Sequence, residues 1–200
     1  MKTLLLLALS IAFAGAAEPE FTDVFTSGQE GYASIRIPSV IVTAKGSVLA
    51  FAEGRVKPAD QAENDIVAKR STDGGRTWSA LRVIHDDGAN SLNNPTAVQE
   101  RASGRIFLIY QRIPAHLRKH SAGTATGLDG PDIYRNLLVW SDDDGATWPV
   151  QRVLYAGPFA YSVLTRFADG TIGCLFEADN YARIVFARVL IAWLEEAPAR

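Results

Sequence analysis

Arg36 is the first side chain in this sequence whose type and setting could do chemistry. It lies between two isoleucines in the segment 35–38, where a permanently charged residue is unusual for a protein core. Taken alone, it is adequately explained as a surface arginine whose aliphatic stem covers apolar neighbours. Arg55 then ends the apolar segment 50–55, and Asp60 follows five residues later. An arginine offers a planar charged fork for a carboxylate, and an aspartate can act as a general acid or base.

Tyr161 and Glu177 form a second candidate pair near the C-terminal end. Tyr161 stands just before the apolar segment 162–166, and Glu177 ends the next one, 172–177. An Asp-Gly turn joins the two segments, which indicates a β-hairpin. A residue before one strand and a residue at the end of its partner lie at the same edge of a hairpin. Tyr161 and Glu177 are therefore expected to meet there.

An eight-residue pattern, Ser-x-Asp-x-Gly-x-Thr-Trp, occurs at 71–78 and again at 141–148. In each copy the aspartate can accept hydrogen bonds from nearby backbone N–H groups, and the glycine tolerates a positive φ. The tryptophan is a large apolar side chain that we expect to be buried beneath a hairpin. Apolar segments precede and follow both copies, so the pattern predicts a repeated β-hairpin unit.

The elements that must position these residues are short strands separated by turns. Turn residues recur at short intervals and no segment has a convincing helical period, which predicts an all-β fold. The polar, glycine-rich stretch 114–131 predicts a long surface loop. The expected strands are 39–43, 48–52, 66–70, 81–84, 97–99, 106–110, 137–140, 151–154, 162–166, 172–177 and a final long strand at 184–193.

In their order along the chain, these segments resemble the exo-α-sialidase (neuraminidase) family, whose members carry the eight-residue pattern as repeated Asp-boxes. The resemblance rests on YASIRIPS, AFAEGR, KPAD and DIVAKRSTDGGRTWS in the first half, and on AYS, DGTIGCLFE and FARVLIAWL in the second. It covers about residues 30–195. It implies a β-propeller, six-bladed in the family, and release of terminal sialic acid from glycoconjugates.

The resemblance assigns roles to individual residues. It implies that Arg36 is the first of three arginines that clamp the substrate carboxylate, that Arg55 supports the site, and that Asp60 is the general acid/base. Asn94 joins the substrate-binding residues on the same resemblance. Asp65 is a competing carboxylate, but the spacing favours Asp60 and leaves Asp65 as a structural residue of its strand.

In the family a tyrosine is the nucleophile and a glutamate polarises it, roles that fall here on Tyr161 and Glu177. Sialidases are the tyrosine-nucleophile exception among glycosidases. The anomeric carbon of sialic acid bears a carboxylate, so a neutral phenol that loses its proton as it attacks avoids a like-charge approach. The resemblance implies a sialylated glycan substrate, a retaining mechanism and no cofactor. The three histidines show no metal-ligand spacing.

The chain is shorter than the family pattern. The family's central stretch, with the other two clamp arginines and a glutamate that activates the tyrosine, has no clear counterpart, and about 183 mature residues predict about four blades. Arg135 precedes the second Asp-box and could be the last clamp arginine, although its spacing favours a structural role. Two functions stay open: an exo-sialidase, expected to be poorly active as this isolated chain, and a non-catalytic Asp-box propeller fragment that binds glycan or has no activity.

Composition addresses localisation and partners. Lys2, the apolar stretch 4–13 and the small residues 14–17 are typical of a secretory signal peptide, with a buried N-terminal helix as the less favoured alternative. A signal peptide at 1–17 leaves a propeller domain at 18–200 that is secreted or periplasmic, and the apolar run is too short for a membrane span. The net charge of −2 gives no reason to expect a nucleic-acid partner. The single cysteine, Cys174, excludes an internal disulfide and is expected to be a small buried apolar residue.

Overall fold

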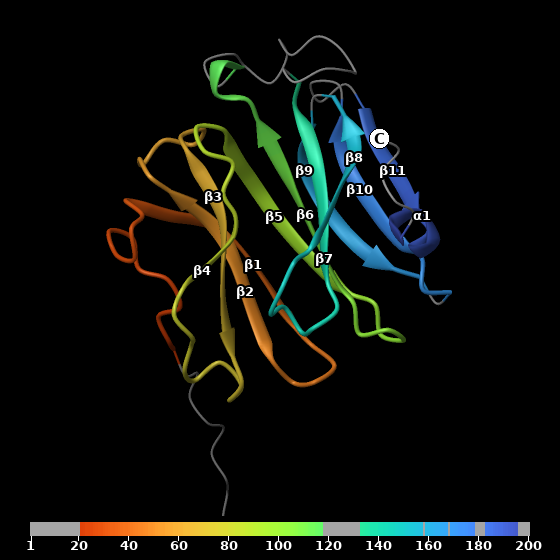
Figure 1. Cartoon of the computed structure of the whole chain (residues 1–200), viewed down its shortest axis with the longest axis horizontal. Coiled ribbons are helices and arrows are strands. Elements are labelled where there is room, and N and C mark those ends of the chain that lie inside the picture. The colour runs from red at the N-terminus through yellow and green to blue at the C-terminus, as the bar shows by residue number, and fades with distance from the viewer. Residues whose placement is uncertain (1–20, 118–132, 158, 168, 179–182, 196–200) are drawn as a thin grey trace, which may run out of the picture.

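The computed structural model confirms the all-β fold (Figure 1). It describes residues 21–117, 133–157, 159–167, 169–178 and 183–195, so the expected signal peptide and most of the expected 114–131 loop lie outside the described residues. Two short helical turns accompany the strands, η1 (Ala115–Leu117) and α1 (Ile191–Glu195). The strands are β1 (Ser34–Val42), β2 (Val48–Arg55), β3 (Asn64–Ser71), β4 (Arg82–His85), β5 (Ser91–Gln99), β6 (Ile106–Ile113), β7 (Arg135–Ser141), β8 (Val150–Ala156), β9 (Phe159–Arg166), β10 (Ile172–Ala178) and β11 (Arg183–Val189).

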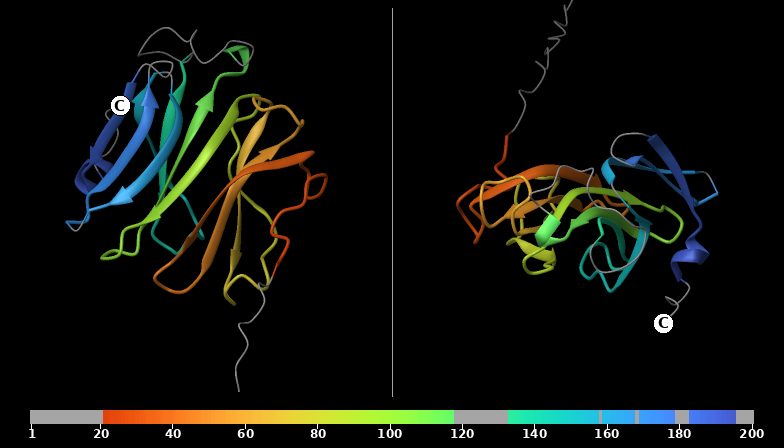
Figure 2. Two further views of the ribbon diagram at one scale, coloured as in Figure 1. Left: turned by 180° about the vertical axis from the view of Figure 1, so that it is seen from behind. Right: turned by 90° about the horizontal axis from the view of Figure 1, so that it is seen from above.

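The strands form three blade-like units that stand side by side in Figures 1 and 2. β1 to β4 are an antiparallel meander, β5 to β8 are a second, and a single parallel pairing between Asn64 and Ser91 joins the two into one eight-stranded sheet. β9, β10 and β11 form a separate antiparallel sheet. The described strands do not close a ring, as expected of an incomplete propeller. They make three units where the length suggested about four, because part of that length lies before β1 and between β6 and β7.

β6 holds the three units together, since each of its faces packs against a different unit. Side chains alternate between the two faces of a strand. Leu108 and Tyr110 lie in a core cluster that includes Leu49, Phe51 and Ile66 of the first unit. Phe107 and Ile109 lie in a second cluster that includes Ile172, Cys174 and Phe176 of the third. This explains why almost every residue of β6 is buried and why its first five residues, 106–110, form a continuous apolar run.

The third unit has one buried and one exposed face. Cys174 is fully buried, as the sequence predicted, and its burial raises the pKa of its thiol to about 12. On the opposite face Val163, Leu175 and Phe186 are cross-strand neighbours in one row, and all three are exposed. An apolar row on an outer sheet face is the surface that a further blade would cover in a closed propeller.

Both Asp-boxes form the turn that their residues predict. The Oγ of Ser71 accepts the N–H of Gly75 at 2.9 Å, and Thr77 donates from both its N–H and its hydroxyl to Asp73. The second box repeats the serine, aspartate and threonine contacts at nearly the same distances. Both tryptophans were expected to be buried, but each is only half-buried. Each lies at the edge of its unit, where solvent still reaches part of the ring.

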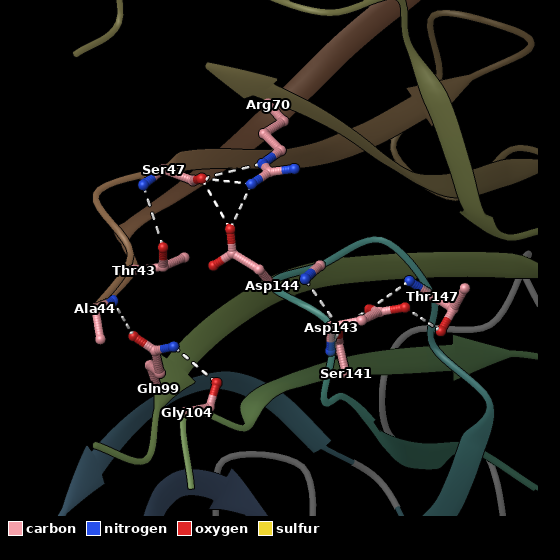
Figure 3. A network of polar contacts seen from close by, with 11 residues as sticks. Thr43, Ala44, Ser47, Arg70, Gln99, Gly104, Ser141, Asp143, Asp144 and Thr147 are labelled. Carbon is pink, nitrogen blue, oxygen red and sulfur yellow. Dashed lines mark hydrogen bonds and ion pairs between the residues drawn. The ribbon is translucent and has the colours of Figure 1, made fainter. Parts of the chain in front are cut away.

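The second box is fastened to the first unit through Asp144 (Figure 3). Its carboxylate accepts hydrogen bonds from Ser47 at 2.8 Å and from Arg70 at 2.5 Å. Burial works against ionisation, but hydrogen bonds from Thr43 and Ser47 and the charge of Arg70 keep the pKa of Asp144 below its ordinary value. A second link runs from the backbone N–H of Ala44 to Gln99 of β5 at 2.6 Å.

The prediction of one long strand over 184–193 was wrong in its second half. β11 ends at Val189, which pairs with Ile172, the first residue of β10. Beyond that residue β10 offers no further partner, and the chain instead turns into α1, where the Trp193 N–H bonds to the Leu190 carbonyl. Among the described residues, no helix has the length and apolar character needed to cross a membrane.

Candidate active site

Arg36 lies on β1 immediately before a break in the strand pairing. It pairs with Glu53 of β2, and the register then shifts before Ser39 pairs with Phe51. Ile37, inside this bulge, has a φ of 54°, a conformation that costs energy for a β-branched residue. Bulges redirect neighbouring side chains and are frequent beside functional sites. The Arg36 side chain is exposed, so its guanidinium is available to a ligand.

Glu53 and Arg55 form a buried ion pair on one face of β2. Their side chains are 1% and 2% exposed. The Arg55 guanidinium donates to Glu53 from Nε at 2.8 Å and from Nη2 at 2.6 Å. Burial raises the pKa of Glu53 against the opposing effect of its hydrogen bonds. Burial disfavours the charge of Arg55 as well, but its bonds to Asp60 and Glu53 prevail and raise its pKa. The described donors of Arg55 are therefore directed to protein carboxylates.

Asp60 is held firmly although its carboxylate faces solvent. Arg55 donates from Nη1 to Asp60 Oδ1 at 2.7 Å, while the Asp60 side chain is 84% exposed. The Asp60 carbonyl accepts the side-chain amides of Asn64 at 3.0 Å and Asn93 at 3.1 Å. Two amides thus fix the main chain and a buried arginine fixes one carboxylate oxygen. An exposed carboxylate in a fixed position is suited to exchange a proton with a bound ligand.

Asp65, the competing carboxylate, has a different environment. It lies in β3, is 8% exposed, and accepts a 2.6 Å hydrogen bond from the Tyr32 hydroxyl. Burial raises the pKa of its carboxyl group. A buried carboxylate bonded to a buried tyrosine ties the N-terminal segment to the sheet. This placement agrees with a structural role for Asp65.

Asn94 joins the cluster through its backbone. It has a φ of 57° and lies in a bulge of β5, where the register shifts between Asn93 and Thr96. Its N–H donates to Glu53 Oε1 at 2.8 Å. Glu53 therefore connects β2 to β5, and Asn94 presents a half-buried side chain beside it.

Tyr161 lies inside β9, not before it as the sequence suggested. Its side chain is 67% exposed. The β9–β10 register shifts between the pairs Phe176–Ser162 and Ala178–Phe159. This irregularity sets Glu177 opposite residues 160–161 in the backbone pairing, so the two predicted residues are neighbours along the ladder. The Glu177 side chain lies outside the described part of the structure.

The site residues thus fall into two groups. In the first group, Glu53 pairs with Arg36 across the ladder and accepts from Arg55 and from the Asn94 N–H. Asp60, in the loop after β2, joins this group through Arg55. In the second group, Tyr161 and Glu177 lie together on the third sheet. No hydrogen bond or ion pair between described residues joins the two groups. β5 lies between them, since it packs against β1 on one side and β9 on the other. Arg135, the alternative clamp residue, begins β7 opposite Arg112.

Glu53 was not singled out from the sequence, although it is the centre of the first group. The available signal was its place two residues before Arg55 within an otherwise apolar segment. Residues i and i+2 of a strand share a face, so Glu53 and Arg55 had to lie side by side. A buried acid next to a buried base requires such pairing.

The chain was compared with known families and proteins. Residues 46–174 match the BNR repeat-like domain. Over 153 residues the chain is 33% identical to a sialidase from Micromonospora viridifaciens, covering 68% of this chain and 23% of that protein. Over 139 residues it is 34% identical to a sialidase from Paraclostridium sordellii, covering 66% of this chain and 33% of that protein. The chain therefore spans about a quarter to a third of the length of these relatives.

Solved structures show the same fold. The Hadza microbial sialidase Hz136 superposes with a TM-score of 0.69 at 23% identity, covering 80% of this chain and 36% of that one. An endo-arabinase from Bacteroides thetaiotaomicron superposes with a TM-score of 0.52 at 11% identity, so the fold alone does not define a substrate. The matched domain assigns the family: this chain belongs to the BNR repeat-like family, and the sequence relatives named above are sialidases.

Proposed function

We propose that this protein is a sialidase-type glycoside hydrolase that releases terminal sialic acid from glycoconjugates with retention of configuration. The observation that carries the proposal is the state of Asp60. Its main chain is fixed by Asn64 and Asn93 and one carboxylate oxygen by Arg55, while the side chain stays 84% exposed. A carboxylate fixed in this way toward solvent is positioned for a reactant that arrives from outside.

In the proposed reaction Asp60 acts twice. It first donates a proton to the departing glycosidic oxygen while the Tyr161 oxygen attacks the anomeric carbon and passes its own proton to Glu177. A covalent sialyl–tyrosine forms and the aglycone leaves with the proton from Asp60. Asp60 then takes a proton from water, which attacks the same carbon; the bond to the Tyr161 oxygen breaks, and Glu177 returns its proton to that oxygen. Arg36 binds the sialic acid carboxylate as a charged fork. The segment 1–17 would direct the enzyme to the periplasm or the cell exterior.

A non-catalytic, glycan-binding role is the second candidate. It is favoured by the separation of the two site groups, which no described hydrogen bond or ion pair joins. Each missing clamp arginine removes a charge-assisted hydrogen bond of roughly 1.5–3 kcal/mol. The further glutamate of the family's central stretch, which has no clear counterpart here, would contribute a factor of roughly 10²–10⁴ in rate. Low turnover by the isolated chain is therefore expected even under the enzymatic proposal.

Hydrolysis of a fluorogenic sialoside separates the two. Under the enzymatic proposal, Tyr161→Phe abolishes normal turnover, and Asp60→Asn slows substrates with poor leaving groups most, because these depend on protonation of the departing oxygen. Asp23→Asn, which removes an exposed aspartate of the segment before β1, is the control and should keep the wild-type rate. Sialic acid binding by calorimetry without turnover would support the binding role. A wild-type rate for Tyr161→Phe would refute the proposed chemistry.

A further inference from the structure

A pocket of about 320 Å³ lies outside the residues assigned to catalysis, between the end of β4 and strands β6 to β8. Three arginines line it: Arg112 from β6, Arg135 from β7 and Arg152 from β8. None of them contributes a described contact to the Asp60 group. Three permanently charged side chains around one small pocket are uncommon in a protein whose net charge is −2.

The charges in this pocket are not balanced by its own lining. Arg112 and Arg135 are direct cross-strand partners, and like charges in this relation destabilise a sheet. Asp87 is the acidic residue among the lining side chains and accepts the Nε of Arg112 at 2.5 Å. His85 also lines the pocket, and burial lowers its pKa, so its ring is neutral at pH 7. The lining therefore carries an excess of positive charge.

Two guanidinium atoms in the pocket lining are buried without a hydrogen-bond partner among the described residues. They are Nη1 of Arg112 and Nε of Arg152. Neighbouring atoms of the same side chains are fixed: Arg112 by Asp87, and Arg152 by the Trp193 carbonyl and by stacking on the Trp193 ring, 5.0 Å from its centroid. A buried donor left without a partner costs free energy. Both side chains are thus held in place with donor capacity unused.

We propose that this pocket is a binding site for an oxyanion, the carboxylate, sulfate or phosphate group of a small molecule or of an acidic sugar. A planar guanidinium matches such a group better than any other side chain does. The ligand would accept hydrogen bonds from the unused donors of Arg112 and Arg152. The site is separate from the Asp60 group, so the proposal does not depend on hydrolysis.

Titration with inorganic sulfate at constant ionic strength, followed by calorimetry or NMR on the full chain, tests the site. We expect saturable binding that weakens at least roughly tenfold in Arg112→Gln, since one charge-assisted hydrogen bond is worth that much. Arg112→Lys keeps the charge but loses the fork, and should also weaken binding. Arg101→Gln is the matched control, an exposed arginine outside this pocket, and should bind sulfate as the wild type does.

A second variant, Asp87→Asn, is expected to bind sulfate more tightly, a result that misfolding could not produce. It removes the single negative charge of the lining while keeping an acceptor for Arg112, so sulfate should bind roughly threefold tighter or better. Competition by glucuronate but not by glucose would identify an acidic sugar as the source of the oxyanion; sulfate binding without this competition would identify a free oxyanion. Absence of saturable binding, or equal losses in Arg112→Gln and Arg101→Gln, would overturn the proposal.

Discussion

The two Asp-boxes have the same internal chemistry and different surroundings. In both, the serine and the aspartate hold the turn through nearly identical hydrogen bonds. In the first box the variable position before the glycine is Gly74, exposed to solvent; in the second it is Asp144, buried against Ser47 and Arg70 of the first unit. Trp78 bonds to its own turn at Gly75, whereas the Trp148 ring packs edge-on against Phe51.

This difference shows that one motif serves two purposes. The first box is a self-contained turn that ends a hairpin. The second is the same turn used as a joint, with its variable residue and its tryptophan turned into contacts between units. The serine and aspartate that define the motif cannot reveal which box is the joint, because they look the same in both. The residue just before the box glycine does reveal it: this residue is Gly74 in the first box and Asp144 in the second.

The largest expected contrast is at the box glycines. Gly75 and Gly145 both have φ near +90°, so alanine costs roughly 1–2 kcal/mol at either position. At Gly145 a Cβ would also lie 2.7 Å from Cδ1 of the buried Leu49, whereas at Gly75 the nearest atom is 3.8 Å away. Gly145→Ala should therefore lose roughly 1–3 kcal/mol more than Gly75→Ala. Urea unfolding of both variants measures this, and equal losses would mean that the second box is not docked.

The next contrast concerns the variable position. Asp144→Asn removes the charge that pairs with Arg70 and should cost about 1–2 kcal/mol, allowing for solvent around the 41%-exposed Arg70. Gly74→Asn places the same side chain at the matched position of the first box, where asparagine tolerates the positive φ, and should change stability by less than about 0.5 kcal/mol. Thermal unfolding compares the two, and a similar loss in both would contradict the joint.

A third test should find no contrast at all. Ser71 and Ser141 are both buried and make the same bonds inside their turns. Serine to alanine should cost about 1 kcal/mol in either box. Denaturant unfolding of the two variants is the measurement. A clear difference between the two losses of unfolding free energy would show that the surroundings of a box change the strength of its internal hydrogen bonds.

The smallest effect is expected in acid. Hydrogen bonds from Thr77 and Ser71 lower the pKa of Asp73, and those from Thr147 and Ser141 lower the pKa of Asp143 to about 2. A carboxylate whose pKa is depressed on folding stabilises the protein above its unfolded pKa of about 4, and this is lost as the pH falls toward 2. Asp73→Asn and Asp143→Asn should each flatten the decline of stability between pH 4 and 2. If both variants lose stability between pH 4 and 2 as steeply as the wild type does, the box aspartates are not the source of that loss.

Local chemistry explains which features the sequence predicted well. The all-β fold, the box turns and the burial of Cys174 follow from turn residues and apolar alternation, which act over a few positions. The predicted strand at 184–193 was too long because its end is set by the first residue of its pairing partner, β10. That pairing joins residues distant in the sequence, so local patterns do not predict it. Glu53 was missed because one charged residue in an apolar strand is informative only once its partners, Arg55 and the Asn94 N–H, are known.

Both faces of β6 are buried, and this affects how the protein unfolds. One face of that strand completes the core of the first unit and the other completes the core of the third. Loss of either unit would leave half of its apolar side chains in water, so partial unfolding is penalised from both sides. The described units should accordingly melt as one cooperative body, and the amide hydrogens of β6 should be among the slowest to exchange with solvent.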